Sequence, residues 1–397
     1  MFQRLKAQAS QISFHLSEFS GGLGDLPTFL IFLIAMVRIN HLEAAPALVF
    51  AGIFNILSGI IFHVPMPVEP MKAIGILAIS TGLSSKGVYL SGILMGIIIL
   101  ILSISGLLRL CMRWTPKGVV RGIQLSLGII VVKQGYDLIP KGGGWFGING
   151  YLMAILVSLF ILFLHKNKII PVALVIFVFG ILVVFINNPA VVHTASIQMY
   201  LPHLMKLNVS SFDKWASLMG IIASQLPITI ANSIIATAML LDDYFPEHTS
   251  SCSVKRIGLS VSLMNLISCP FGGMPMCHGA GGLAAQYRFG ARTGLSVVYI
   301  GVIKLIGGFL FSGYVLLIAT LFPGVLLGSM FIFTGVELAT HIKDLKQQSD
   351  VFSMILTSGI TIASNIAIGF VAGIVSYYGW EYWRVGLKLR KEIVKND

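Results

Sequence analysis

Long apolar segments, separated by short stretches with glycine, proline or charge, follow one another along almost the whole chain. Those of the first half lie at about residues 22–38, 42–62, 69–84, 88–108, 118–133, 149–165 and 169–187. Those of the second half lie at about 214–240, 254–269, 276–288, 294–320, 323–341, 351–364 and 365–382. A helix of about 20 apolar residues is long enough to cross a bilayer. The pattern therefore predicts an all-α, polytopic membrane protein with about 14 transmembrane helices.

Composition supports this fold class. Of the 397 residues 56% are apolar and only 11% are charged, which is too few charged residues to cover the surface of a protein in water. The start of the chain lacks the compact apolar core and cleavage site of a removed signal peptide, so we expect residues 1–21 to remain as a cytoplasmic or interfacial segment. The four cysteines lie in apolar spans or on the predicted inner side, where a disulfide framework is not expected.

The basic residues indicate an orientation. The net charge is +12, and cytoplasmic loops of membrane proteins are enriched in Lys and Arg. With the amino end inside, 19 of the 27 Lys and Arg residues fall on the inner side and 6 on the outer side, while Lys72 and Lys304 lie within spans. Both termini are therefore predicted to be cytoplasmic, in a multi-pass protein of the bacterial inner (plasma) membrane. The positive charge reflects this topology, and we expect lipid rather than nucleic acid as the surroundings.

Three short motifs occur twice in the same order. Leu26-Pro27-Thr28 is matched by Leu226-Pro227-Ile228, and the later pairs begin at Asn55 and Asn265 and at Met66 and Met274, with offsets of 200, 210 and 208 residues. Weak internal similarity of this kind is typical of transporters built from inverted repeats. An odd number of spans in each half inverts the second half. We therefore predict a 7+7 inverted repeat, with repeats at 22–190 and 214–382, an external connection at 191–213 and a cytoplasmic tail at 383–397.

Proline and glycine interrupt two of the predicted spans. Residues 65–70 contain three prolines, so we expect extended chain over 62–69 and a helix from about Pro70 to residue 83. That helix would rise roughly 20 Å, which is less than the roughly 30 Å of the hydrocarbon core. Residues 269–282 are rich in proline and glycine too, and a short helix follows that reaches Arg288. The third and tenth spans are thus predicted to be half-helices.

The predicted topology brings the amino ends of these two half-helices together near the midplane of the bilayer. A helix amino end offers unpaired N–H groups and a partial positive charge, which together hold anions. Gly279, Gly281 and Gly282 would let a ligand approach closely, and Lys72 would add a full charge. The alternative is that proline and glycine only kink helices for packing. Two clustered interruptions at repeat-related positions, each beside an ionisable residue, favour a binding site.

Acidic residues within spans are few, and two of them lie at interruptions. A carboxylate at the bilayer centre costs roughly 2.5–3.5 kcal/mol and is normally paired, protonated or functional. Asp25 lies at a Gly-Asp-Leu-Pro break in the first span, and Glu69 immediately precedes the first half-helix. Protonation of Glu69 would relieve its repulsion of an anionic substrate, which gives a physical route to proton–anion symport. The alternative is that Glu69 caps a helix or forms a permanent ion pair with Lys72.

Several other polar residues have more than one interpretation. Glu337 is either a charge within a span or an interfacial residue that pairs with His341. Cys277 and His278 have no Cys or carboxylate partners at ligand spacing, so we expect no metal site. His278 fits a hydrogen-bond donor at a helix start, a proton carrier or a structural histidine.

Other function classes find little support in the sequence. No Walker or Rossmann glycine pattern occurs between a strand and a helix, so neither ATP hydrolysis nor a dinucleotide cofactor is indicated. An enzyme that uses Cys277 and His278 would need a base and an orienting partner, which the sequence does not supply. We expect neither catalysis nor a cofactor.

Three stretches resemble the molybdate transporter family of plants and bacteria, which is related to the sulfate permeases but lacks their STAS domain. They are Leu23 to Asp25, Val64 to Lys72 and Met274 to Arg292. The resemblance covers nearly the whole chain, and the short tail after about residue 382 agrees with the missing domain. It implies a fold like that of uracil permease and makes a homodimer plausible. A core domain would carry the site between spans three and ten, flanked by spans one and eight. Spans five to seven and twelve to fourteen would form a gate domain.

The resemblance also implies the residues of the site. Proton coupling would fall to Glu69 and Asp25, and at position 69 we expect Gln in the family where this chain has Glu. Substrate contacts would come from Thr28, Pro67, Val68, Glu69, Pro70, Met71, Lys72, Gln225, Met274, Pro275, Met276, Cys277, His278, Gly279, Ala280, Gly281 and Gly282. The sequence thus predicts a secondary active importer of a tetrahedral oxyanion, molybdate first and sulfate second, which works by alternating access with protons as the coupling ion. An uncoupled anion channel is the alternative.

Overall fold

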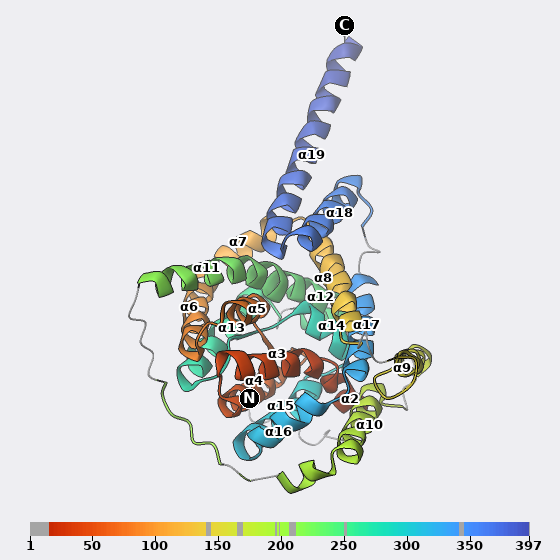
Figure 1. Cartoon of the computed structure of the whole chain (residues 1–397). Coiled ribbons are helices and arrows are strands. Elements are labelled where there is room, and N and C mark those ends of the chain that lie inside the picture. Colours follow the sequence, from red (N-terminus) through yellow and green to blue (C-terminus); the bar gives the residue numbers. More distant parts are fainter. Residues whose placement is uncertain are drawn as a thin grey trace.

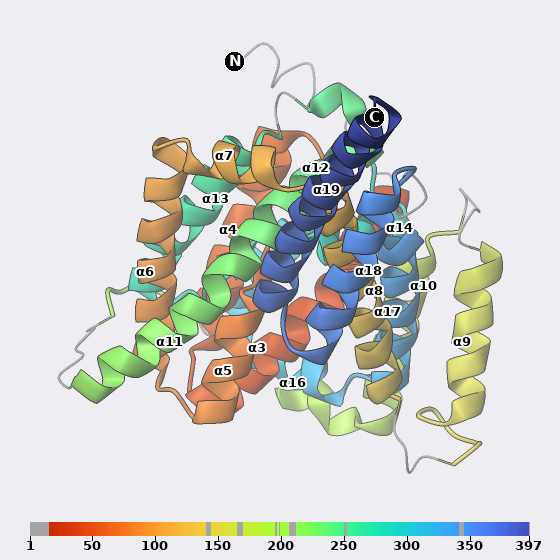
Figure 2. The ribbon, with the colours of Figure 1, turned by 90° about the horizontal axis from the view of Figure 1, so that it is seen from above.

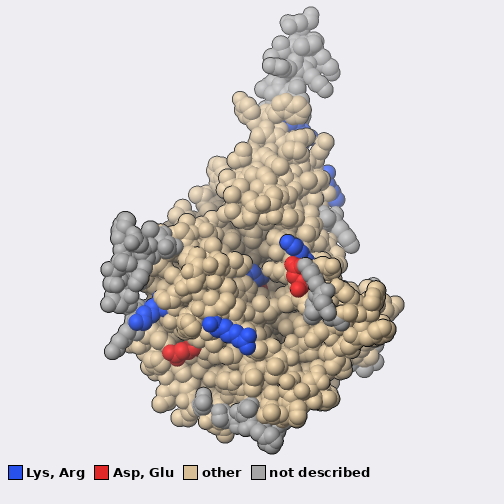
Figure 3. All heavy atoms as spheres, in the orientation of Figure 1, with Lys and Arg blue, Asp and Glu red and all other residues tan. Residues whose placement is uncertain are grey.

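The computed structural model describes residues 16–139, 144–164, 170–194, 197, 199–205, 212–249, 252–340 and 345–396. Most of the segment expected at 1–21 and the residue His341 therefore lie outside the described residues. The described chain is almost entirely helical (Figure 1). Helices with outward-facing apolar side chains dominate its surface, and Lys, Arg, Asp and Glu are sparse on the face seen in Figure 3.

The helices follow one another with short connections. The first half contains α2 (Leu16–Leu23), α3 (Leu26–Asn40), α4 (Ala44–Phe62), α5 (Lys72–Thr81), α6 (Ser85–Ile104), α7 (Leu107–Trp114), α8 (Lys117–Asp137), α9 (Tyr151–Leu164), α10 (Val172–Asn187) and the 3-10 turn η1 (Pro189–Thr194). The second half contains α11 (Phe212–Ile228), the π-helix η2 (Thr229–Ala236), α12 (Thr237–Tyr244), α13 (Val254–Ser268), α14 (Ala280–Arg288), α15 (Leu295–Leu310), α16 (Ser312–Leu321), α17 (Gly324–Ala339), α18 (Gln348–Ala363) and α19 (Ile366–Asn396). Two further 3-10 turns are η3 (Pro246–His248) and η4 (Cys269–Phe271), and two short strands are β1 (Glu69–Pro70) and β2 (Met276–Cys277).

Local sequence explains many of the helix boundaries. A proline immediately precedes each of α8, α10 and α17, and proline disfavours helical geometry in the residue before it. Among the described residues, 4 helical stretches are long and apolar enough to cross a membrane unaided, and up to 6 if each of two bent helix pairs is one span. These stretches agree with the predicted class of a multi-pass, all-α membrane protein.

One predicted span differs in the structure. Residues 294–320 were expected to form a single apolar helix, but α15 ends at Leu310 and α16 leaves it at an angle of 114°. Their sequence contains no proline, but Gly307, Gly308 and Gly313 flank the bend, and glycine weakens a helix. A similar bend of 91° separates α7 from α8, where Pro116 does mark the break. The region expected as a tail from residue 383 continues helix α19, which extends away from the other helices in Figure 1.

Helices from the two halves of the chain pack against each other. Helix α4 packs along α15, α6 along α13, and α8 along α17 (Figures 1 and 2). The main apolar core lies between α3, α4, α5, α6, η2, α13 and α14. Helix α9 lies at the edge of the molecule in both views. The two interrupted segments run through the main core, so protein encloses their non-helical backbone. Non-helical backbone inside a membrane needs such an enclosure, because lipid cannot satisfy its hydrogen bonds.

Candidate functional site

The two interrupted segments meet as a short antiparallel strand pair in the core. Glu69 of β1 lies opposite Cys277 of β2, and Pro70 lies opposite Met276. The backbone N–H of Met71 donates to the carbonyl of Pro275 at 2.9 Å. The half-helices α5 and α14 begin directly after these strands. The prolines thus keep both segments extended, and the strand pair holds the two helix starts close together.

Two buried polar side chains fix this strand pair to helix α13. Asn265 accepts the N–H of Met276 at 2.9 Å and donates to its carbonyl at 2.7 Å. His278 donates from Nδ1 to the carbonyl of Pro67 at 2.7 Å, so its Nε2 accepts the hydroxyl of Ser260 at 2.9 Å in the neutral ring. Protein groups thus satisfy both ring nitrogens of His278. Of the roles that the sequence left open, this geometry fits the structural histidine.

The amino end of α5 is capped by a neutral side chain from α11. Oε1 of Gln225 accepts the backbone N–H groups of Ala73 and Ile74 at 2.9 and 3.1 Å. Its Nε2 donates to the hydroxyl of Thr229 at 2.9 Å. Pro227 lies inside the same helix and is followed by the π-helix η2, because proline cannot supply a regular helical hydrogen bond. This break places the fully buried amide of Gln225 against the start of α5.

The amino end of α14 is capped by a carboxylate. Oε1 of Glu69 accepts the backbone N–H of Gly282 at 2.9 Å, and its Oε2 lies 3.0 Å from Nζ of Lys72. Glu69 is only 1% exposed. A Cβ atom at Gly282 would lie 2.1 Å from Oε1 and one at Gly279 would lie 2.6 Å from it, so only glycine permits this approach. The helix cap and the ion pair, which the sequence offered as one alternative for Glu69, are thus both present.

A second acid and a second lysine complete this charged cluster. Asp25 lies between α2 and α3, is 4% exposed, and its Oδ1 has no hydrogen-bond partner among the described residues. Its carboxylate bonds to the side chain of Thr28 and interacts electrostatically with Glu69, Lys304 and Lys72.

Lys304 of α15 comes from outside the two interrupted segments. Its Nζ donates to Oδ1 of Asn55 at 3.0 Å and lies 3.9 Å from the ring centroid of Phe29, a cation–π contact. Lys304 was not among the predicted site residues. Its signal in the sequence is a lysine within an apolar span, which is rare unless the residue is paired or functional.

Most of the remaining predicted residues surround the strand pair as packing. Val68, Met71, Met274, Met276 and Cys277 belong to the main apolar core, and Pro67, Pro70, Pro275, Gly279, Ala280 and Gly281 are buried too. The side chain of Lys72 is 28% exposed, and Thr28 is partly buried. Of the predicted set, these two residues are thus the ones that are not fully buried.

Polar contacts join α8 and α17 to the carboxyl-terminal ends of α12 and α14. Arg121 of α8 pairs with Asp243 of α12 through two contacts of 2.7 and 3.1 Å. Glu337 of α17 pairs with Arg288 of α14 at 3.3 Å and accepts the hydroxyl of Tyr244 at 3.4 Å. The expected partner of Glu337, His341, lies outside the described residues. These ion pairs link α8 and α17 to the helices that carry the site.

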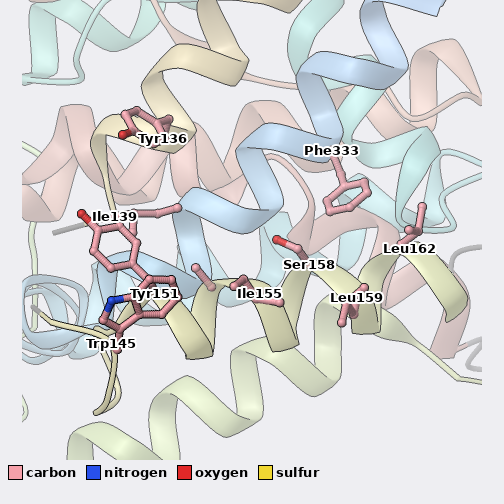
Figure 4. A pocket seen from close by; sticks show the side chains of 10 residues that line it. Tyr136, Ile139, Trp145, Tyr151, Ile155, Ser158, Leu159, Leu162 and Phe333 are labelled. Carbon is pink, nitrogen blue, oxygen red and sulfur yellow. The ribbon is translucent and has the colours of Figure 1, made fainter. Parts of the chain in front are cut away.

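A cavity of about 570 Å³ lies elsewhere, between α8, α9 and α17 (Figure 4). Its lining is almost wholly apolar and aromatic, with Ser158, two tyrosines and the indole N–H of Trp145 as the polar groups. An oxyanion needs several N–H or cationic donors, which this cavity does not offer. The charged cluster at the half-helices is therefore the candidate site.

Two solved structures with a similar fold are a bicarbonate transporter and an anion transporter. The transmembrane domain of a cyanobacterium bicarbonate transporter, BicA, matches with a TM-score of 0.59 and 16% identity, over 91% of this chain and 98% of that one. The murine anion transporter Slc26a9 in its inward-facing state matches with a TM-score of 0.63 and 13% identity, over 94% of this chain and 69% of that one. At such identities the likeness concerns the fold alone.

The chain belongs to the family described as "Molybdate transporter of MFS superfamily", whose pattern matches residues 17–131 and 217–338. It is 36% identical to Molybdate transporter 1 of Arabidopsis thaliana over 95% of this chain and 90% of that protein. It is 34% identical to Molybdate transporter 2 of the same plant over 91% and 86% of the two chains. The family resemblance predicted from the sequence is thus confirmed, and the protein is an integral, multi-pass membrane protein.

Proposed function

We propose that this protein is a secondary active transporter that imports a tetrahedral oxyanion, with molybdate as its substrate, by alternating access and in symport with protons. One observation carries the proposal. The carboxylate of Glu69 is held between the N–H of Gly282 at the start of α14 and the ammonium group of Lys72. A helix amino end with an adjacent cation is suited to an oxyanion, and here the protein places its own anionic group there. The names of the relatives support molybdate as the particular substrate.

Exchange of Glu69 for substrate gives a route to proton coupling. A divalent anion beside ionised Glu69 would be repelled, because like charges in a poorly solvated site interact strongly. A proton on Glu69 removes that repulsion and frees Lys72 to pair with the substrate. Asp25 is a second acid in the same cluster and has an unpartnered oxygen among the described residues. Protons on both carboxylates would compensate the two charges of the anion.

The repeat architecture is part of the proposal. We assign the 14 spans, in chain order, to α2 with α3, α4, α5, α6, α8, α9, α10, α11 to α12, α13, α14, α15, α17, α18 and α19, with α7 and α16 as connecting helices. The crossing of α8 and α17 supports an internal two-fold relation. Gly128 contacts the backbone of Gly335, and Gly135 contacts that of Gly328, so the helices run antiparallel. Gly128 and Gly328 are 200 residues apart, as are Gly135 and Gly335, and this is also the offset of the Leu-Pro motif. Each contact therefore has its counterpart in the other when the two halves are interchanged.

Alternating access requires one group of helices to move against the other. The ion pairs of Arg121 with Asp243 and of Arg288 with Glu337 join the two groups at one end of the molecule. We assign this end to the cytoplasmic side of a bacterial inner membrane, because Lys117 and Arg113 lie beside it and basic residues mark the inner side. These pairs would close the inner entrance and would separate when the site opens inward.

Uptake of radiolabelled molybdate tests the proposal, in cells that lack their own molybdate and sulfate carriers. We expect saturable uptake that increases as the external pH falls, with weak competition by excess sulfate. Cells with the Lys72→Gln variant are the control for uptake through this site. Saturable sulfate uptake that molybdate does not inhibit would reassign the substrate. Anion currents whose reversal potential is independent of pH would show that the protein is a channel and not a proton-coupled transporter.

A further inference from the structure

A pocket of about 440 Å³ lies between the start of α18 and the middle of α19, away from the candidate transport site. Three of its lining residues precede or begin α18, and three belong to one turn and a half of α19. They are Lys346, Gln347, Gln348, Trp380, Trp383 and Arg384. The pocket therefore combines two cationic side chains, two amides and two indole rings, which are groups that suit a phosphate joined to an apolar body.

Contacts around this pocket place it at the level of the bilayer interface. Asp350 in the first turn of α18 accepts the N–H of Gly118 at 2.9 Å, which ties α18 to the start of α8. The hydroxyl of Tyr378 donates to the carbonyl of Trp114 at 3.1 Å, which ties α19 to the end of α7. Because α7 lies at 91° to the spanning helix α8, it runs along the membrane surface at this end. The pocket is thus level with a surface helix.

Exposed aromatic residues mark the same level. Trp114 is 60% exposed, Trp383 is 58% exposed and Tyr382 is 85% exposed. Tryptophan and tyrosine gather where the headgroups meet the hydrocarbon, because their rings are apolar and their edges are polar. The ring centroids of Trp380 and Trp383 lie 5.8 Å apart, and Trp380 packs on Phe352 at 5.0 Å. The indole wall of the pocket is therefore built into the α18–α19 pair rather than left loose.

The pocket also carries two positive charges, and in the part of the chain that the structure describes an acidic side chain lies near only one of them. Nη1 of Arg384 lies 3.7 Å from Oε1 of Glu381, which is too long for a good hydrogen bond, and its side chain is 54% exposed. Lys346 forms no ion pair among the described residues. Further along α19 the sequence adds Lys388, Arg390, Lys391 and Lys395. Basic residues clustered beside a membrane span attract anionic lipids.

We infer that this pocket binds the phosphate group of an anionic phospholipid, with Lys346 and Arg384 as the cationic ligands. The amides of Gln347 and Gln348 supply neutral donors, and the two indole rings contact the glycerol and the first part of the acyl chains. A bound lipid would join α18 to α19 and so fix the position of the long last helix. The inference is independent of which anion the protein transports.

Native mass spectrometry of the full chain tests this site. The protein is titrated in detergent with phosphatidylglycerol and, separately, with phosphatidylcholine of the same chain length. Each basic residue near a membrane surface contributes about 1 kcal/mol to anionic lipid binding, so the Lys346→Gln/Arg384→Gln variant should bind phosphatidylglycerol roughly 30-fold more weakly. The matched control is Lys86→Gln/Lys133→Gln, which removes two exposed lysines from other helices and should bind as the unaltered protein does.

Three results would overturn the inference. They are equal binding of the two lipids by the unaltered protein, an unchanged affinity in the pocket variant, and an equal loss in the control variant. A further experiment distinguishes a lipid headgroup from free phosphate as the ligand. Inorganic phosphate is added to the protein in phosphatidylcholine, and the thermal stability of the protein is measured. If free phosphate protects the fold against heating as strongly as phosphatidylglycerol does, and the pocket variant loses that protection, the site takes a soluble oxyanion and the lipid assignment is wrong.

Discussion

The starts of the two half-helices are built alike but closed by different chemistry. At α5 the cap is the amide of Gln225, which has no charge and donates onward to Thr229. At α14 the cap is the carboxylate of Glu69, paired with Lys72 and close to Asp25. Asp25 and Gln225 are separated by 200 residues, the offset of the Leu-Pro motif that follows each of them. The residue before the Leu-Pro motif is therefore acidic in the first half and neutral in the second.

This difference assigns separate roles to the two helix starts. The N–H groups at α5 are satisfied by a neutral group that no proton can release, so this end is a fixed part of the framework. The N–H of Gly282 at α14 is satisfied by an ionisable group, and in the proposed mechanism a proton weakens this contact and the substrate replaces it. The asymmetry predicts that substitutions of Glu69, which caps α14, or of its partner Lys72 change transport, whereas substitution of Gln225, which caps α5, changes stability.

Lys72→Met should have the largest effect, because it leaves the carboxylate of Glu69 buried without its cation. Breaking a buried pair in this way costs roughly 3–5 kcal/mol, so we expect uptake to be lost and thermal stability to fall. Adding Glu69→Gln should restore stability, since no unpaired charge remains, but not uptake. Thermal unfolding in detergent and uptake assays measure the two effects. Full uptake by the single variant would remove Lys72 from the site.

Lys304→Met should have the second-largest effect, because this lysine places a positive charge near Asp25 in the cluster that contains Glu69. Hydrogen bonds to charged groups contribute roughly 1.5–3 kcal/mol, so we expect uptake to fall by about tenfold or more. Asn55→Leu removes the acceptor of Lys304 but leaves its charge, and it should cause a smaller loss of uptake. If the two variants transport equally, the charge of Lys304 does not act on the site.

Glu69→Gln tests proton coupling directly. The amide oxygen can still accept the N–H of Gly282, so we expect the protein to fold and to transport, with uptake changed only a few-fold at neutral pH. The dependence of uptake on external pH should become weaker, because position 69 no longer binds a proton and Asp25 is the acid that remains in the cluster. A pH profile that matches that of the unaltered protein would refute the coupling role of Glu69.

Gln225→Leu should act on stability more than on transport. It leaves the N–H groups of Ala73 and Ile74 without their acceptor, which costs about 2 kcal/mol for a buried pair of donors. We expect a lower unfolding temperature and an unchanged pH profile of uptake. A change in the pH profile would show that the start of α5 takes part in coupling and would remove the contrast between the two helix starts.

Ser260→Ala should have the smallest effect, because it removes one of the two hydrogen bonds of His278. The loss is expected to be about 1 kcal/mol of stability, with uptake and its pH dependence unchanged. An altered pH profile would return His278 to the role of proton carrier.

Much of this architecture follows from local sequence. Apolar runs predicted a multi-pass, all-α membrane protein, and three prolines within residues 65–70 predicted the extended segment before α5. The helix begins at Lys72, two residues later than expected at Pro70, because Pro70 itself belongs to the strand pair. The spacing of Glu69 and Lys72 already allowed an ion pair between them. Each of these features depends on neighbours in the chain, so the order of residues alone carries it.

Other features were decided by contacts between distant residues. Gln225 reaches Ala73 across 152 positions, and Lys304 reaches Asn55 across 249 positions, so no local pattern marks either partner. The bend between α15 and α16 arises without a proline, although the same stretch reads as one apolar span. Local sequence patterns determined neither which group closes each helix start nor where a continuous apolar run turns. Those choices depend on which donor, acceptor and charge the packed helices bring within reach of one another.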